Sequence, residues 1–475
     1  MKRIFFLIGF ICFVTVSTHA QIMFQRHYGG SGDEYGSTCI QTSDGGYIVT
    51  GSTDSYGLGG RDIYVVRTNE YGDTIWKKTC GGNGDDQATC IIETNDGGYA
   101  ITGITSSFGA GSTDVYLIKI NQNGDTIWTK TYGGSGAESG YCLLQTPTND
   151  YIISGFTESY SPVTSSIYII KTDSNGDTLW AKTYYKQDVN TGYAIIQTVD
   201  NNYLVGITLS NTVSTHDYMI AKIDSLGDTL WTKVYDKGAN DWFSSVVELD
   251  GGDFVVSGFT NSLGYGGYDM FLARYNSSGD EIWFKTYGGT EDDLGGGVIF
   301  TNDLSIINCG STFSFGKGGE DFYLVKINLN GDTIWTKTYG GIDNDYGGSI
   351  MQTTDGGLII GGSSSSYGNG SEIFLIKTNP NGYAGIDQNY SIVKEVKVFP
   401  NPNNGAFIIE QENSDASSSS LRIFDITGKQ VYYRPDVFQN SMTENIAVPD
   451  LCSGTYFLTI SDEYHNAATK LTIIK

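Results

Sequence analysis

Carboxylates at repeating positions are the residues of this sequence with the clearest capacity for chemistry. Carboxylate oxygens are ligands that Ca²⁺ prefers, and six recurring acids are candidate cation ligands: Glu34, Asp62, Asp86, Asp114, Asp293 and Asp321. No copy contains a complete calcium-binding loop. We expect these side chains chiefly to accept hydrogen bonds from the N–H groups of glycine-rich loops, with Ca²⁺ binding as the alternative.

An irregular repeat provides a second candidate site, formed by Asp241, Trp242 and Phe243. Most repeats begin with Tyr-Gly-Gly, but two of them replace the glycine pair by Tyr185-Lys186 and by Asp236-Lys237. An aromatic side chain on a loop can stack on a sugar or on a protein side chain. The sequence therefore indicates a ligand site at these three residues, although the aromatic rings could equally fill the space that smaller residues leave.

Catalytic motifs are absent from the sequence. It contains no Gly-x-Ser-x-Gly, His-Glu-x-x-His or Cys-x-x-Cys pattern, and His27, His216 and His465 fall in unrelated contexts. A glycosidase needs only two carboxylates at the right separation, but nothing singles out one pair among the many acids. We therefore expect a binding protein. A secreted carbohydrate-active enzyme and a structural component of the cell surface are the alternatives.

Short repeated strands must position these residues. Six tryptophans lie 52, 52, 51, 52 and 52 residues apart, and each closes a similar repeat: Trp76, Trp128, Trp180, Trp231, Trp283 and Trp335. In the first repeat, strand-like runs cover residues 37–42, 47–53, 62–68 and 74–79. Four antiparallel strands in a repeat of this length are typical of one β-propeller blade. Counting the repeats predicts an all-β fold with a seven-bladed β-propeller.

The two ends of the repeat region complement each other. The seventh repeat lacks its last strand, because Asn379–Gly382 is followed by Tyr-Ala-Gly. Residues 23–30 align with the missing strand and place Phe24 at the tryptophan position. We expect this N-terminal strand to complete the last blade and so to remove an exposed sheet edge. The propeller is predicted to cover residues 21–385, with a linker at residues 386–395.

Basic residues recur in two sets, one on the last strand of each repeat and one at the end of the third strand. The first copies are Lys78 and Arg67. Because they recur in every repeat, we expect them to pair with nearby acids such as Asp73 and not to form a single functional site.

Charge and targeting signals narrow the function further. The formal net charge of −25 argues against nucleic-acid binding, which requires clustered Lys and Arg. Residues 1–20 read as a secretory signal peptide, with Lys2-Arg3 before an apolar run. No later segment is apolar over the length that a membrane-spanning helix needs. We therefore expect an exported chain without a transmembrane helix.

The cysteines show no metal-binding spacing. Six follow the signal peptide: Cys39, Cys80, Cys90, Cys142, Cys309 and Cys452. Sequence alone does not select among their possible pairings, so their disulfide state is left open. Cys90 and Cys142 occupy the same register in neighbouring repeats, and we expect them to act as small core residues.

The last 80 residues follow a different pattern, with strand-like alternation typical of a small β-sandwich. Their blocks are Val398–Gly405, Leu421–Gly428, Leu451–Leu458 and Lys470–Lys475. Together these blocks closely resemble the type A C-terminal sorting domain of the type IX secretion system of Bacteroidetes. The resemblance implies that residues 396–475 form an Ig-like sandwich that the outer-membrane translocon recognises. Such a domain is usually then removed, as the cargo is released or attached to surface lipopolysaccharide.

The repeat region resembles uncharacterised secreted propellers that carry the same tail. Signal peptide and sorting domain together predict a secreted or cell-surface protein whose partner in export is the type IX machinery. We expect the propeller to act there as a binding or adhesion module for a glycan or a protein.

Overall fold

The computed structural model describes residues 21–186, 189–210, 215–368, 370–384, 397–410, 419–425, 429–437, 443–461 and 466–475. The predicted signal peptide and the predicted linker at residues 386–395 lie outside these ranges. The chain divides into two compact units, residues 1–387 and 388–475. All the elements in the described ranges of both units are strands.

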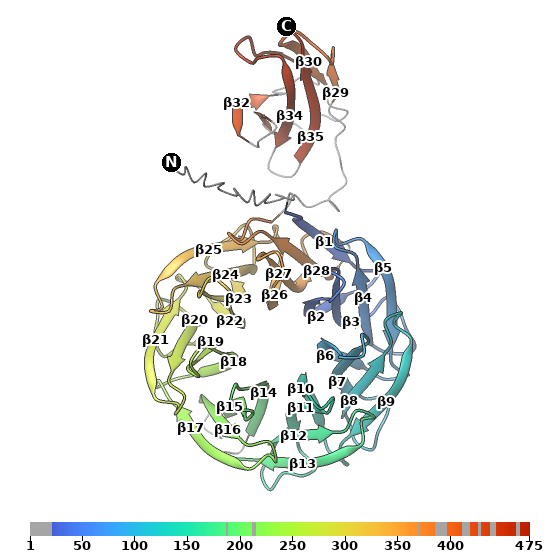
Figure 1. Cartoon of the computed structure of the whole chain (residues 1–475), viewed down its shortest axis with the longest axis vertical. Coiled ribbons are helices and arrows are strands. Elements are labelled where there is room, and N and C mark those ends of the chain that lie inside the picture. The colour runs from blue at the N-terminus through green and yellow to red at the C-terminus, as the bar shows by residue number, and fades with distance from the viewer. Residues whose placement is uncertain are drawn as a thin grey trace, which may run out of the picture. The chain divides into compact units, whose positions relative to one another are not determined.

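The larger unit consists of seven four-stranded antiparallel sheets that follow one another around a ring (Figure 1). We number them in chain order from the first complete sheet. Sheet 1 contains β2 (Glu34–Gln41), β3 (Tyr47–Thr53), β4 (Asp62–Thr68) and β5 (Thr74–Cys80). Sheet 2 contains β6 (Asp86–Glu93), β7 (Tyr99–Thr105), β8 (Asp114–Ile120) and β9 (Thr126–Tyr132). Sheet 3 contains β10 (Glu138–Gln145), β11 (Tyr151–Thr157), β12 (Ser166–Thr172) and β13 (Thr178–Tyr184).

Sheets 4 to 6 repeat this order. Sheet 4 contains β14 (Val189–Gln197), β15 (Tyr203–Ser210), β16 (His216–Ile223) and β17 (Thr229–Tyr235). Sheet 5 contains β18 (Asp241–Glu248), β19 (Phe254–Thr260), β20 (Asp269–Tyr275) and β21 (Glu281–Tyr287). Sheet 6 contains β22 (Asp293–Phe300), β23 (Ile306–Thr312), β24 (Asp321–Ile327) and β25 (Thr333–Tyr339).

Sheet 7 joins the two ends of the repeat region. It contains β26 (Asp345–Gln352), β27 (Leu358–Ser364), β28 (Glu372–Thr378) and, beside β28, the N-terminal β1 (Phe24–Tyr28). Phe24 lies opposite Lys377 and is 1% exposed. Its ring meets Tyr47 edge-on at 5.5 Å, as Trp76 meets Tyr99 at 6.4 Å in the next sheet. Phe24 therefore takes the place that a tryptophan occupies in the other sheets.

The two middle strands of each sheet supply the core, because neighbouring sheets cover both of their faces. Every residue of β3 and β4 is buried, whereas the outer strand β5 alternates between exposed and half-buried residues. Continuous apolar runs are expected for strands covered on both faces. Glycines at one position of the second strand allow close contact with the bulged first strand. A Cβ atom at Gly103, for example, would overlap the backbone oxygen of Gln87.

The recurring basic residues form ion pairs in the pattern that the sequence predicts. Six outer-strand bases reach the turn of the following sheet, in the pairs Arg26–Asp73, Lys78–Asp125, Lys130–Asp177, Lys182–Asp228, Lys233–Asp280 and Lys285–Asp332. Lys337 lies instead over the ring of Tyr383, which stands at the position of the aspartate. The third-strand bases pair within their own sheet, as Lys377 does with Asp355. These contacts tie the turns to the strands around the rim.

The C-terminal unit is a separate all-β structure. Its strands are β29 (Lys397–Phe399), β30 (Ala406–Glu410), β31 (Ser419–Phe424), β32 (Gln430–Val437), β33 (Thr443–Ala447), β34 (Gly454–Ser461) and β35 (Asn466–Ile473). They form a three-stranded sheet, β29-β30-β33, and a four-stranded sheet, β32-β31-β34-β35. Phe407 and Ile446 of the first sheet share one buried core with Leu421, Leu458 and Leu471 of the second.

Two further properties bear on export and redox state. No helix in the described part of the chain has the length and apolar character required to cross a bilayer. The six cysteines of the described units are free thiols, of which Cys39 and Cys309 are buried and Cys452 is exposed.

Candidate functional site

The acid that begins the first strand of most sheets ties two loops together. Asp86 is fully buried, and its carboxylate accepts hydrogen bonds from the backbone N–H of Gly82 at 2.8 Å and the hydroxyl of Ser107 at 2.6 Å. Glu34 is held in the same way by the N–H of Gly30 at 2.7 Å and by Thr53 at 2.6 Å. These are the loop hydrogen bonds predicted for the recurring carboxylates.

The acid that begins the third strand faces the first set across a glycine. Asp62 accepts the N–H of Leu58 at 2.7 Å, and a Cβ atom on Gly81 would overlap the carboxylate of Asp62 and lie 2.8 Å from that of Asp86. The glycine therefore lets two carboxylates of neighbouring sheets approach each other. Burial raises the pKa of Asp62, and the charge of Asp86 adds to the rise.

The same pairing recurs at other junctions between sheets. The paired acids are Asp114 with Glu138, Asp269 with Asp293, Asp321 with Asp345 and Glu372 with Glu34, each flanking the glycine of its junction. Burial raises the pKa of Asp321 to about 6, and the negative charge of Asp345 contributes to this rise. Each of the six predicted cation ligands, Glu34, Asp62, Asp86, Asp114, Asp293 and Asp321, thus lies near one other carboxylate, and only Asp62 and Asp86 are partners of each other.

The junction between sheets 4 and 5 differs because Asp236 occupies the position of that glycine. Its carboxylate joins those of Asp217 and Asp241, so that one oxygen from each residue lies within 4.8 Å of the other two. Asp217 and Asp241 are buried, whereas Asp236 is exposed. Asp241 still accepts the N–H of Lys237 at 2.8 Å and the hydroxyl of Thr260 at 2.5 Å. The usual loop geometry is therefore kept, and a third carboxylate is added to it.

Three carboxylates at this distance repel one another unless a proton or a cation neutralises part of their charge. Their oxygens suit Ca²⁺, which takes oxygen ligands at about 2.3–2.6 Å, so that ligands on opposite sides of the ion lie about 5 Å apart. Among the described residues this is the acidic group that combines three such side chains within reach of one ion. Asp236 was not among the predicted ligands, although an aspartate at a glycine position was visible in the sequence.

The predicted aromatic residues of this junction differ in accessibility. Trp242 is half-buried and stacks on His216, with ring centres 3.8 Å apart, and on Phe259 at 5.8 Å. Phe243 is 3% exposed and fills space beside Gly206 in the core. Phe243 therefore packs and presents no surface to a ligand, whereas Trp242 retains an exposed part.

Comparison with known proteins identifies the C-terminal unit. Residues 397–475 match the family described as a secretion system C-terminal sorting domain. The predicted sorting domain is confirmed. It indicates export by the type IX system to the cell surface or the extracellular space. Residues 353–382 match a β-propeller family described as a domain of unknown function, DUF5122.

The repeat region has more distant relatives. The regulatory protein FlaEY of Caulobacter vibrioides is 21% identical over 365 residues, and the match covers 62% of this chain but 38% of that protein. The chain thus corresponds to less than half of that relative.

Among solved structures, the Pan2 WD40 domain of Neurospora crassa is 9% identical with a TM-score of 0.47 and covers 76% of this chain and 98% of its own. A puromycin hydrolase is 10% identical with a TM-score of 0.49, and the match covers 80% of this chain and 59% of that protein. The β-propeller domain of the trilobed protease from Pyrococcus furiosus is 11% identical with a TM-score of 0.40, and the match covers 76% of this chain and 98% of that domain.

Proposed function

We propose that this chain is an exported seven-bladed β-propeller that binds a ligand at the cell surface or outside the cell. In this proposal an Ig-like C-terminal domain engages the type IX translocon and delivers the propeller. The observation that carries the proposal is the match of residues 397–475 to a secretion sorting domain, in a chain whose other unit is a ring of repeated sheets. A ring of this kind offers loops on a rigid scaffold, where binding residues are commonly found.

The junction between sheets 4 and 5 is the proposed binding site. Asp217, Asp236 and Asp241 would hold one Ca²⁺ ion, and Trp242 follows Asp241 on the same strand. An ion with open coordination positions suits a glycan, whose hydroxyls can join the ion, and an exposed aromatic ring offers a surface on which a sugar can stack. The function proposed for the propeller is adhesion to such a glycan, without catalysis.

Substitution at position 236 provides a matched test of the cation site. Asp236→Gly restores the residue found at most other junctions, so the variant should fold. We expect Ca²⁺ in hundred-fold excess over its dissociation constant to stabilise the mature chain by about 2.7 kcal/mol. The same addition should leave the Asp236→Gly variant unchanged in thermal unfolding. An equal rise in both proteins would place Ca²⁺ elsewhere and contradict the proposed site.

Deletion of the sorting domain tests the proposed route of export. A chain that ends at residue 387 should cross the inner membrane but should not reach the cell surface. Protease treatment of intact cells should therefore degrade the full-length propeller and spare the truncated one. Equal exposure of both proteins at the surface would refute the role assigned to the C-terminal unit.

A further inference from the structure

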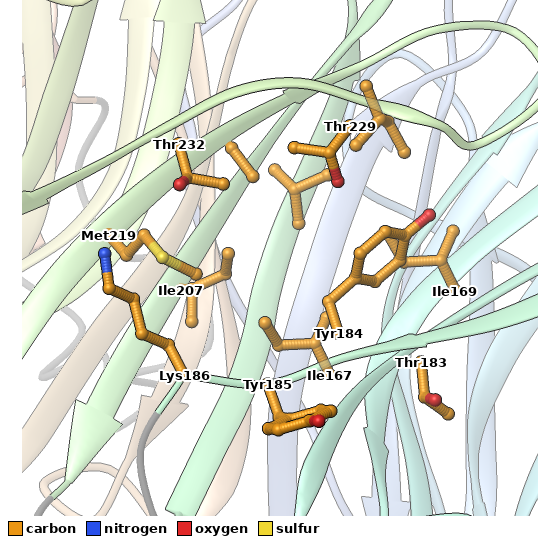
Figure 2. A pocket seen from close by; sticks show the side chains of 13 residues that line it. Ile167, Ile169, Thr183, Tyr184, Tyr185, Lys186, Ile207, Met219, Thr229 and Thr232 are labelled. Carbon is orange, nitrogen blue, oxygen red and sulfur yellow. The ribbon is translucent and has the colours of Figure 1, made fainter.

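A cavity of about 270 Å³ lies between sheets 3 and 4 (Figure 2). Its walls are apolar and come from the facing strands of the two sheets. Ile167 and Ile169 of β12 face Val205, Ile207 and Met219 of β15 and β16. Interiors of proteins are usually packed without such voids. The cavity is therefore a departure from the packing of the repeat.

The cavity exists because sheet 4 lacks bulk at two positions of its third strand. Met219 stands where the other six sheets carry an aromatic ring: Tyr64, Tyr116, Tyr168, Phe271, Tyr323 and Phe374. Ala221 stands where most other sheets carry valine or isoleucine. Sheet 5 also has an alanine there, but its Phe284 stacks on Phe271 at 4.9 Å. Sheet 4 has Thr232 at the position of Phe284, so its gap is not filled.

The junction between sheets 3 and 4 is the one junction where the usual acids are replaced by neutral residues. Ser166 begins the third strand of sheet 3, and Asn190 follows the loop into sheet 4. Both stand at positions where the other junctions carry the recurring carboxylates. Tyr185 and Lys186 replace the glycine pair and line the cavity. Figure 2 shows both side chains on the same side of it, with the Lys186 amine turned toward Met219.

Lys186 adds a positive charge to the lining of the cavity, in a protein whose formal net charge is −25. Its side chain is exposed, and no ion pair of Lys186 is found among the described residues. Among the described residues that line the cavity there is no carboxylate. The cavity therefore combines an apolar interior with one cationic group and the hydroxyls of Thr183 and Thr232 near its edge.

We propose that this cavity binds one free, unbranched aliphatic carboxylate, with its chain between sheets 3 and 4 and its carboxylate at Lys186. A volume of about 270 Å³ lies just below the range of roughly 300–1,000 Å³ typical of pockets for drug-sized ligands. At about 30 Å³ for each water-sized group, it accommodates roughly nine such groups. Decanoate is the probe that fits best. The site does not share residues with the three-carboxylate cluster, so its test is independent of cation binding.

The test is a calorimetric titration of the mature full-length chain with fatty acids below their micelle-forming concentrations. We expect one decanoate per chain. Each additional buried methylene should raise the affinity roughly fourfold, so octanoate should bind about fifteen-fold more weakly than decanoate. Decyltrimethylammonium, which has the same chain length and the opposite charge, should not bind. Vesicles of phosphatidylglycerol should not bind either.

Two variants separate the apolar and the charged part of the site. Met219→Tyr restores the ring that four other sheets carry, so it should keep or raise the thermal midpoint while removing decanoate binding. Lys186→Gln should weaken decanoate about tenfold or more and leave the binding of 1-decanol unchanged. Met351→Tyr, at an exposed methionine of β26, is the matched control and should bind decanoate normally.

Several results would overturn the proposal. Decanoate affinity that survives in Met219→Tyr would place the ligand elsewhere. Equal affinity for decanoate and decyltrimethylammonium would remove the role of Lys186, and preferential binding to the vesicles would indicate a membrane surface as the partner. If Met219→Tyr fails to fold, an unchanged decanoate affinity in Lys186→Gln still contradicts the assignment.

Discussion

Replacing Asp321 by asparagine should stabilise the protein at neutral pH. Asp321 is 1% exposed, accepts the N–H of Lys317 at 2.8 Å and faces the carboxylate of Asp345 across Gly340. Burial and this neighbouring charge raise its pKa from 3.8 to about 6. Asparagine has nearly the same shape, keeps an oxygen for Lys317 and carries no charge. The variant therefore removes the cost of a buried charge with little change in packing.

The sign and size of this effect follow from linkage between protonation and folding. A carboxyl whose pKa is raised in the folded state favours folding when it is protonated. Its contribution to the free energy of unfolding is therefore largest below pH 3.8 and is lost as the pH rises through 6. The rise from 3.8 to about 6 corresponds to about 3 kcal/mol. We expect Asp321→Asn to exceed the natural protein in free energy of unfolding by up to about 3 kcal/mol at pH 7, and to match it near pH 3.5.

The assay is urea denaturation of the mature chain between pH 3.5 and pH 8, followed by tryptophan fluorescence in the presence of EDTA. Asp355→Asn is the control, for which we expect the opposite change in the free energy of unfolding. Burial of Asp355 would raise its pKa, but hydrogen bonds from Thr353 and Lys377 hold that pKa below its ordinary value. This control should destabilise the protein at pH 7 and lose its effect in acid. A difference between Asp321→Asn and the natural protein that does not change with pH would refute the reasoning.

Three other substitutions and one control test the contacts that hold the ring together. Phe24→Ala should lower the free energy of unfolding by about 3–5 kcal/mol, measured in urea, because it empties a buried aromatic position in the closing strand. Gly103→Ala should destabilise by about 1–3 kcal/mol or more, because its Cβ would overlap the oxygen of Gln87. Gly348→Ala is its neutral control, since nothing lies within 4 Å of a Cβ there. Lys78→Ala should cost less than about 1 kcal/mol, and the loss should shrink in high salt, because its ion pair is exposed.

The repeat could be predicted from the sequence because each copy carries the same local signals. The tryptophan period fixed the length of the unit, and the alignment of Phe24 with Trp76 located the closing strand before any pairing was known. The ion pair between Arg26 and Asp73 also followed from recurrence. These features depend on residues whose types are repeated, so one chain supplies several independent examples of the same structural requirement.

The candidate sites were harder to predict because they depend on distances between sheets. Asp236 indicates a cluster of carboxylates only once Gly81, at the same position in another repeat, is seen to lie between two carboxylates. The sequence does not show that contact. Phe243 alternates with Trp242 along one strand, and only the structure shows which of the two enters the core. Met219 is an ordinary apolar residue in a strand, so the missing volume beside it becomes visible only when the neighbouring sheet is in place.

Pairing of β1 with β28 also determines when, during synthesis of the chain, the ring can close. Residues 24–28 are synthesised before the other strands of the ring. Their partners at residues 373–377 are synthesised more than three hundred residues later. No shorter nascent chain can close the ring, and until closure β28 keeps an unpaired edge that another chain could join. Such distant pairing is slow to form. Closure is therefore a late step, and an incomplete chain is marked by an open edge that a protease or a chaperone can recognise.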